Sequence, residues 1–169
     1  MLRLIIVLVL TVQVTISFAS ATEIRRVVTG PDASDRSTAM FDSRVHLKDI
    51  QPDLSLGYLW VTHAFPVDLS NADTREEVVG ISPPANGTQF GVVEFQPIDP
   101  ANPPSPSWHR TRTVDYVMVV SGEIDLMLDR SVVHLKAGDT VVQQATNHAW
   151  VNRGKETCRL LFVVMDAKP

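Results

Sequence analysis

The residues with the clearest chemical potential lie between Trp108 and Asn152. His109, Asp115 and His148 supply two imidazoles and one carboxylate. These donors, placed on three sides of a cavity, form the facial triad that binds Fe(II) and leaves coordination positions open. Mn, Zn, Ni or Co would suit the same donors. The pattern therefore predicts a site for a divalent metal ion.

The spacing of His109 and Asp115 restricts how such a site can form. In one extended strand, at ~3.3 Å per residue, the two would lie about 20 Å apart, whereas metal–ligand bonds measure about 2 Å. We therefore expect the chain to fold back over residues 111–113, so that His109 ends one strand opposite Asp115 at the start of the next. His148 must then arrive from a neighbouring strand, after a turn at residues 145–147.

The same residues also admit structural roles. His109 capped by backbone groups, Asp115 paired with Arg110 or Arg112, and His148 held within a turn are the alternatives. Around them, five residues are candidates for the wall of a substrate pocket: Trp60, Thr111, Gln143, Asn147 and Trp150. Ligand pockets combine mostly apolar walls with a few polar groups, and this set supplies both.

These candidates differ in the role that their side chains suit. Gln143 and Asn147 suit contacts with ligand oxygens or with the imidazoles that bind the metal. Trp60 has the competing interpretation of a plain core residue, because it sits in a long apolar run. Trp150 lies two residues after His148 in the sequence, which suits a place in the pocket wall beside that histidine.

Short strands must position these residues. Runs of apolar and β-branched residues are separated by Gly, Pro and Asp turns, and they occupy residues 24–29, 44–47, 54–65, 90–95, 116–120, 123–128, 132–135, 140–144 and 160–165. Many short strands with no long amphipathic helix predict an all-β sandwich or barrel. Residues 116–120 and 160–165 are apolar on both faces. We therefore expect the outer face to pack on another sheet or on a second subunit, as in a homodimer.

Composition limits the class of protein. The chain of 169 residues suits one domain, and its net charge of -4 gives no reason to expect a nucleic-acid partner. Cys158 is the only cysteine, which excludes an intramolecular disulfide and a thiolate-rich metal cluster. It lies in an apolar run and is expected to be a buried, inert thiol.

The first 21 residues follow a different pattern. A basic start, an apolar stretch and the small residues 19–21 are typical of a secretory signal peptide. Cleavage would make the protein secreted or a resident of the secretory pathway, with a mature chain starting near Thr22. The alternatives are an uncleaved signal anchor, or a misassigned start codon on a cytoplasmic protein.

From Trp108 onward, the chain resembles the cupin superfamily, in particular the small single-domain cupins of the type-2 conserved barrel. The first cupin motif, a His-x-His pair followed by an acidic residue and a glycine, corresponds here to His109, Thr111, Asp115 and Gly122. The second motif corresponds to Gly138, Asp139, Gln143 in place of proline, Ala145 in place of glycine, His148 and Asn152.

The resemblance implies a jelly-roll β-barrel in a single domain. Residues 108–169 would be the cupin core, and residues 22–107 would add N-terminal strands and a Pro-rich loop. Cupins normally bind metal through three histidines and one glutamate, whereas this chain has Thr111 and Asp115 at two of those positions. Either three ligands bind the metal or metal binding is weakened, and Thr111 remains able to hydrogen-bond a metal-bound water.

The resemblance also implies a function. We expect a metal-dependent enzyme that acts on a small aromatic or polyketide-like metabolite, with oxidoreductase or oxygenase chemistry. The alternatives are a metal-dependent decarboxylase, dehydratase or isomerase, or a small-molecule-binding cupin without catalysis. The chain has no nucleotide-binding glycine motif, so hydride transfer would require a separate dehydrogenase as a partner.

Overall fold

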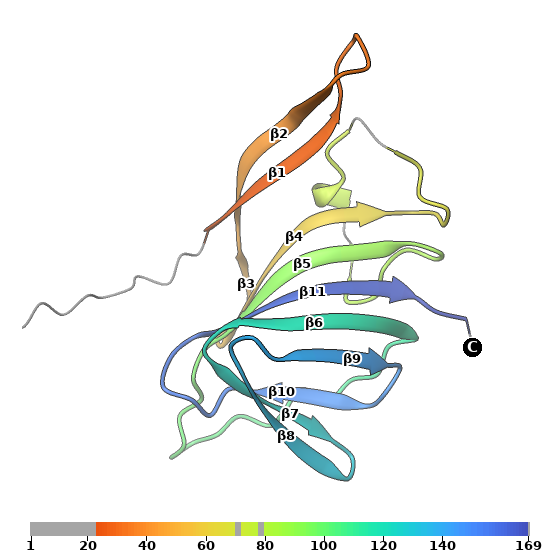
Figure 1. Ribbon diagram of the computed structural model, residues 1–169. Helices are drawn as coiled ribbons and strands as arrows, with labels where there is room; N and C mark the ends of the chain where they lie inside the picture. The colour runs from red at the N-terminus through yellow and green to blue at the C-terminus, as the bar shows by residue number, and fades with distance from the viewer. Residues whose placement is uncertain (1–22, 70–71, 78–79, 169) are drawn as a thin grey trace, which may run out of the picture.

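The protein is built almost entirely of antiparallel strands (Figure 1). The computed structural model describes residues 23–69, 72–77 and 80–168. The strands are β1 (Glu23–Pro31), β2 (Ser37–His46), β3 (Lys48–Gln51), β4 (Leu54–Thr62), β5 (Thr88–Phe95), β6 (Thr113–Ser121), β7 (Glu123–Leu128), β8 (Ser131–Lys136), β9 (Thr140–Gln144), β10 (His148–Val151) and β11 (Cys158–Asp166). One 3-10 turn, η1 (Arg75–Glu77), lies between β4 and β5.

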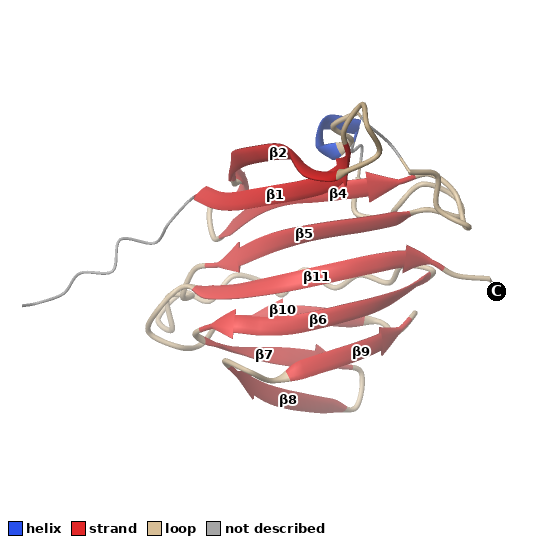
Figure 2. Ribbon diagram, turned by 45° about the horizontal axis from the view of Figure 1, so that its top comes forward, coloured by secondary structure: helices blue, strands red, loops and turns tan. Residues whose placement is uncertain are grey.

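The strands form two facing sheets and a hairpin. The larger sheet has six strands in the order β3-β4-β5-β11-β6-β9, and the smaller has three in the order β10-β7-β8. The hairpin β1-β2 lies next to β4, at the β3-β4 end of the larger sheet (Figures 1 and 2). The all-β, jelly-roll-type barrel expected from the sequence is confirmed.

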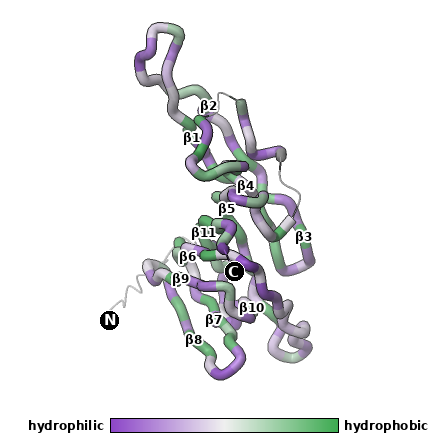
Figure 3. Tube along the Cα trace, turned by 90° about the vertical axis from the view of Figure 1, so that its right-hand side faces the viewer, coloured by the Kyte–Doolittle hydropathy of each residue, from purple (hydrophilic) through white to green (hydrophobic). Residues whose placement is uncertain are grey.

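The main core lies between the two sheets. The buried residues that form it are Val119, Ile124, Leu126, Leu135, Cys158 and Leu160. Alternation along each strand places these side chains inward, and apolar positions gather on β5, β11 and β6 (Figure 3). Cys158 is buried as expected, and this burial raises the pKa of its thiol to about 11.

A second, smaller core covers part of the outer face of the larger sheet. Val45 of the hairpin packs there against Leu59 and Val92, with Leu161 of β11 at its margin. This accounts for part of the two-faced apolar pattern, because the chain covers the outer face of β4 and β5 itself. On β6 and β9 the outer face stays exposed, with Tyr116, Met118 and Val142 at 50%, 44% and 63% exposure. The homodimer stays a prediction.

The hairpin differs from the sequence-based expectation. Strand β2 already begins at Ser37, whereas the sequence predicts a strand only at residues 44–47. Most of β2 is exposed, so no apolar alternation marks it. The turn is closed by the Asp32 carboxylate, which accepts hydrogen bonds from the backbone N–H groups of Ser34 and Arg36 at 2.8 and 3.0 Å.

The expectation about targeting concerns the N-terminal residues. The signal peptide expected at residues 1–21 lies outside the described residues and stays a prediction. Among the residues that are described, no helix is long and apolar enough to cross a membrane.

Candidate functional site

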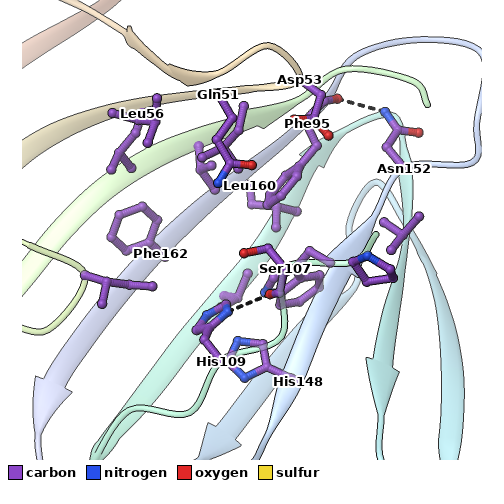
Figure 4. Close-up of a pocket in the computed structure, with 18 of the residues that line it drawn as sticks. Gln51, Asp53, Leu56, Phe95, Ser107, His109, His148, Asn152, Leu160 and Phe162 are labelled. Atoms are coloured by element: carbon purple, nitrogen blue, oxygen red, sulfur yellow. Dashed lines mark hydrogen bonds between the residues drawn. The ribbon is translucent and has the colours of Figure 1, made fainter. Parts of the chain in front are cut away.

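A cavity of about 530 Å³ lies between the two sheets. One end is lined by His109, Thr111, Asp115 and His148. Away from this end the wall is mainly apolar, with side chains such as Leu56 on β4 and Phe162 on β11. In Figure 4 the two imidazoles lie side by side at one end of the site, and the apolar side chains extend away from them.

The two histidines are brought together by backbone pairing. His109 and His148 form an isolated antiparallel bridge, each backbone N–H donating to the other's carbonyl at 3.0 Å. Their ring centroids are 4.1 Å apart. The chain bends at Arg112 before β6 begins. The backbone partner of His109 is therefore His148 on β10. Asp115 reaches the site from another strand, β6.

Each imidazole is oriented through its Nδ1 atom. The Nδ1 of His109 lies 3.0 Å from the carbonyl oxygen of Ser107, and the Nδ1 of His148 lies 3.0 Å from that of Thr146. A carbonyl oxygen only accepts, so these contacts favour the tautomer with hydrogen on Nδ1 and a lone pair on Nε2. Metal-binding histidines are typically oriented in this way.

The pKa of His148 favours the neutral form. Burial of the ring, only 2% exposed, lowers its pKa below the usual value of 6.5. The Thr146 carbonyl acts in the opposite direction, neighbouring His109 lowers the pKa further, and Asp115 raises it. A neutral imidazole is the form that binds metal ions.

Asp115 and Gln143 form the inner part of the site. They face each other across β6 and β9 and are 8% and 5% exposed. The Gln143 Nε2 donates to Asp115 Oδ2 at 3.3 Å and lies 2.8 and 2.9 Å from the two ring nitrogens of His148. With hydrogen on Nδ1, the only ring acceptor is the Nε2 lone pair, and an amide nitrogen almost equally close to both ring nitrogens lies across the ring.

Two buried oxygen atoms of this pair have no partner. Asp115 Oδ1 and Gln143 Oε1 are buried acceptors with no hydrogen bond. Burying a polar group without a partner is costly, and for a carboxylate the cost is larger. The site therefore holds more acceptors than its own donors satisfy.

These acceptors fit a divalent cation chemically. Among the described residues that line the cavity, none is Lys or Arg, so no side-chain cation serves the Asp115 carboxylate. Yet in the described part of the chain no three His, Cys, Asp or Glu side chains converge closely enough to hold a metal ion. His109 and His148 are already together, and the Gln143 amide lies between His148 and Asp115. The three-ligand site stays a prediction.

The candidate pocket residues divide into two groups. Thr111 and Trp150 line the cavity, and the Thr111 hydroxyl is 2.7 Å from that of Thr113. Trp60, Gln143 and Asn147 lie outside the lining. Gln143 sits behind the lining residues, and Asn147 instead donates to Asp129 at 2.8 Å.

The position of Trp60 has a specific cause. The pairing of β4 with β5 shifts between Tyr58 and Trp60, so that Trp60 pairs with Phe90. Such a bulge reverses the simple alternation of faces. Trp60 thereby leaves the cavity side, and its ring lies near the guanidinium of Arg26, 6.0 Å from ring centroid to Cζ.

The apolar wall itself was not among the sequence-based candidates. Inward positions of β4, β5 and β11 supply it, including Leu56, Val93 and Phe162. Gly91 makes room for the Phe162 ring, since a Cβ there would lie 2.5 Å from it. The signal that could have identified this wall is the alternation along the three strands.

Residues 91–164 match the family model described as "Cupin domain". This region is a cupin. Among solved structures, the Schizosaccharomyces pombe Cnp3 cupin domain matches with a TM-score of 0.52 at 14% identity, covering 85% of this chain and 87% of that one. At this identity, the likeness establishes the cupin fold and nothing further.

Sequence relatives of this chain carry more specific names. "Phomopsin biosynthesis cluster protein C'" of Diaporthe leptostromiformis is 37% identical over 122 residues, covering 65% of this chain and 60% of that protein. "Cupin-domain-containing oxidoreductase srdD" of Neurospora crassa is 33% identical over 117 residues, covering 65% of this chain and 57% of that protein. The match thus spans less than two thirds of either relative. The chain is similar to proteins named for biosynthesis clusters and for oxidoreductase activity.

Proposed function

We propose that this cupin is a metal-dependent enzyme with oxidoreductase or oxygenase chemistry on a small aromatic or polyketide-like metabolite. The observation that carries the proposal is the pair of imidazoles, with centroids 4.1 Å apart, beside a buried carboxylate oxygen that has no partner. This group sits at one end of a cavity of about 530 Å³, a size that suits a small metabolite. Similarity to proteins named as cupin-domain oxidoreductases supports the choice of chemistry.

His109, His148 and Asp115 would hold the metal, with Fe(II) as the first candidate and Mn, Zn, Ni or Co as alternatives. When bound, such an ion supplies Lewis-acid or redox chemistry at its open positions. The Ser107 and Thr146 carbonyls favour a lone pair on both Nε2 atoms, and the Gln143 amide, 2.9 Å from His148 Nε2, would have to move for a metal to bind there. With a ligand in place, the apolar wall would keep water from the histidine end, and this would strengthen the electrostatic interactions there.

Three further features belong to this proposal. The exposed apolar side chains on β6 and β9 would be covered in a homodimer. A separate dehydrogenase would supply any hydride-transfer step. The segment 1–21 would direct the chain into the secretory pathway if it is cleaved, which N-terminal sequencing of the mature protein tests.

The metal content of the purified protein tests the metal site of this proposal. The purified protein, reconstituted with Fe(II) without oxygen, is expected to retain about one metal ion per chain after desalting. His109→Ala and His148→Ala should lose it, while His46→Ala, at an exposed surface histidine, should retain it. Equal metal content in all four proteins, or none in the wild type, would contradict the metal site.

A binding module without catalysis is the second candidate. It is favoured by Thr111 at a position where cupins usually have a ligand and by the Gln143 amide between His148 and Asp115. A protein that binds metabolites equally well with and without metal, and leaves them unchanged under oxygen, would support this candidate against the enzyme. Metal-dependent decarboxylation, dehydration or isomerisation would appear in the same assay as product formed without oxygen.

A further inference from the structure

The cavity wall is divided by polarity along the strands. Strand register places Gln143 opposite Asp115, Asp115 opposite Val164, and Val164 opposite Gln89. This cross-section of the larger sheet carries the polar groups of the histidine end. It is the first of four successive layers of inward-facing side chains.

The next three layers of the larger sheet are apolar. The first contains Val117, Phe162, Gly91 and Tyr58, the second Val119, Leu160, Val93 and Leu56, and the third Cys158, Phe95 and Leu54. Successive layers are two residues apart on each strand, so the four layers extend over about 20 Å. Cys158 and Val119 lie behind the wall, and the other side chains face the cavity.

Three polar side chains of the wall, those of Tyr58, Gln89 and Asn152, make hydrogen bonds within the protein. The Tyr58 hydroxyl donates to the Gly80 carbonyl at 2.9 Å, and the Gln89 Nε2 lies 3.2 Å from the same oxygen. The Asn152 Nδ2 donates to Phe95 and Glu156 carbonyls at 2.8 and 2.9 Å. In contrast, Asp115 Oδ1 at the histidine end has no partner.

The charged residues of the cavity wall also distinguish the histidine end from the rest of the cavity. Its ionisable carboxylates are Asp53 and Asp115, and its described residues include no Lys or Arg. Away from the histidine end, an anionic ligand group would therefore meet apolar side chains and no countercharge, which is unfavourable. In Figure 4, Leu56 and Gln51 lie at the end of the site away from the histidines, and Phe162 lies between Leu56 and the histidines.

We propose that the ligand of this cavity is amphipathic, with one polar head group and an uncharged, apolar body. The head lies at His109 and His148, and the body lies along β4, β5 and β11. The inference rests on the proposed function only in placing the reacting group at the metal-binding end. A free sugar, a sugar phosphate or a dicarboxylic acid does not fit this wall, since each would bury polar or charged groups among the apolar layers.

Phenols that carry a para-alkyl chain test the proposal directly, by calorimetric titration of the full chain. From ethyl- to pentylphenol, the dissociation constant is expected to fall about threefold to fourfold per added methylene. 4-(2-Methoxyethoxy)phenol has a side chain of the same length with two ether oxygens, and should bind at least about tenfold more weakly than pentylphenol. A flat series, or equal binding of this matched pair, would overturn the proposal.

Variants locate the body of the probe. Leu56→Gln should weaken pentylphenol binding about tenfold and leave the binding of phenol itself unchanged. Val142→Gln, on the exposed outer face, is the matched control. If Leu56→Gln does not fold, Leu56→Ala replaces it, with a smaller loss expected. Equal pentylphenol binding by the folded Leu56 variant and the control would contradict the assigned position.

The titrations are run on protein treated with EDTA and on protein loaded with Fe(II). If no metal binds but the chain-length series persists, the proposed enzyme function fails and the amphipathic ligand stands. If metal binds but the series is flat, the ligand proposal alone fails.

Discussion

Replacing Gln143 by glutamate would test the inner part of the site, because the substitution changes charge and hardly changes shape. The Gln143 Nε2 lies 3.3 Å from Asp115 Oδ2, and both residues are buried. Gln143→Glu would place two carboxyl groups at that distance, and like charges there cannot both ionise freely. At an effective dielectric constant of ~20, the repulsion of two unit charges would be about 5 kcal/mol.

The variant would avoid part of this repulsion by keeping one proton. An exposed glutamate has a pKa of about 4.3, and each pH unit above that value costs about 1.4 kcal/mol if the folded protein must stay protonated. The loss therefore reaches about 4 kcal/mol at pH 7 and falls to about 1 kcal/mol at pH 5. The sign follows from a folded-state pKa raised above the unfolded one, so the variant loses stability as pH rises.

Thermal unfolding of the metal-free protein measures this effect. A loss of about 4 kcal/mol corresponds to a fall of about 8–16 °C in Tm for a domain of this size. Gln144→Glu is the matched control, since Gln144 is the exposed neighbour on β9 and should change Tm little. Divalent Mn or Zn should restore much of the loss in Gln143→Glu, because a cation would compensate the second carboxylate.

Two results would refute this reasoning. A Tm of Gln143→Glu that is independent of pH between 5 and 7 would mean that the two carboxyl groups do not interact. A loss with the expected pH dependence but no recovery with any divalent ion would mean that the acceptors around His148 do not form a cation site.

Three other predictions concern stability and reactivity. Asp73→Ala should destabilise the protein by about 3–5 kcal/mol in denaturant titrations, because it leaves the buried Arg26 guanidinium without its carboxylate. Since Arg26 lowers the pKa of Asp73, the contribution of this ion pair is present at neutral pH and should be lost as pH falls through that lowered pKa, so the difference between Asp73→Ala and wild type should shrink in acid. The thiol of Cys158, with a pKa of about 11, should not react with a thiol reagent at pH 8 until the chain unfolds, and rapid reaction of the native protein would show that β11 opens easily. Gly91→Ala should cost about 1–3 kcal/mol and displace the Phe162 ring, because the new Cβ would lie 2.5 Å from that ring; an unchanged Tm would contradict the close packing.

The sequence predicts the strands of the cupin core well because two signals coincide there. Apolar alternation and Gly or Asp turns mark β7 and β8, and the observed bounds agree with the expected ones to within one residue. Strand β2 of the hairpin lacks the first signal, because most of it is exposed. Hydrophobic pattern identifies a strand only where one of its faces is buried.

The site was harder to predict because it depends on pairings between distant segments. Spacing required that His109 and Asp115 lie on different strands, and that holds. Spacing could not show that His109 pairs with His148 through the backbone. The two residues are 39 positions apart in the sequence (148 minus 109). Nor could spacing show the bulge that turns Trp60 away from the cavity, since a bulge adds a residue without changing composition.

The substitution of Thr111 for a usual cupin ligand now has a structural context. The Thr111 hydroxyl is engaged with Thr113, at 2.7 Å, so it does not replace the missing imidazole as a strong donor. On the adjacent strand β9, Gln143 contacts both Asp115 and His148 and keeps one buried oxygen without a partner. In the proposed metal site, Gln143 is therefore the residue that could add a donor beside His148 and Asp115. The amide presents its nitrogen to both residues, so its oxygen could bind a metal only after the amide turns over, and an amide oxygen is a weaker ligand than an imidazole nitrogen for Fe or Zn. The proposed site would therefore hold an exchangeable metal more readily than a permanently bound one.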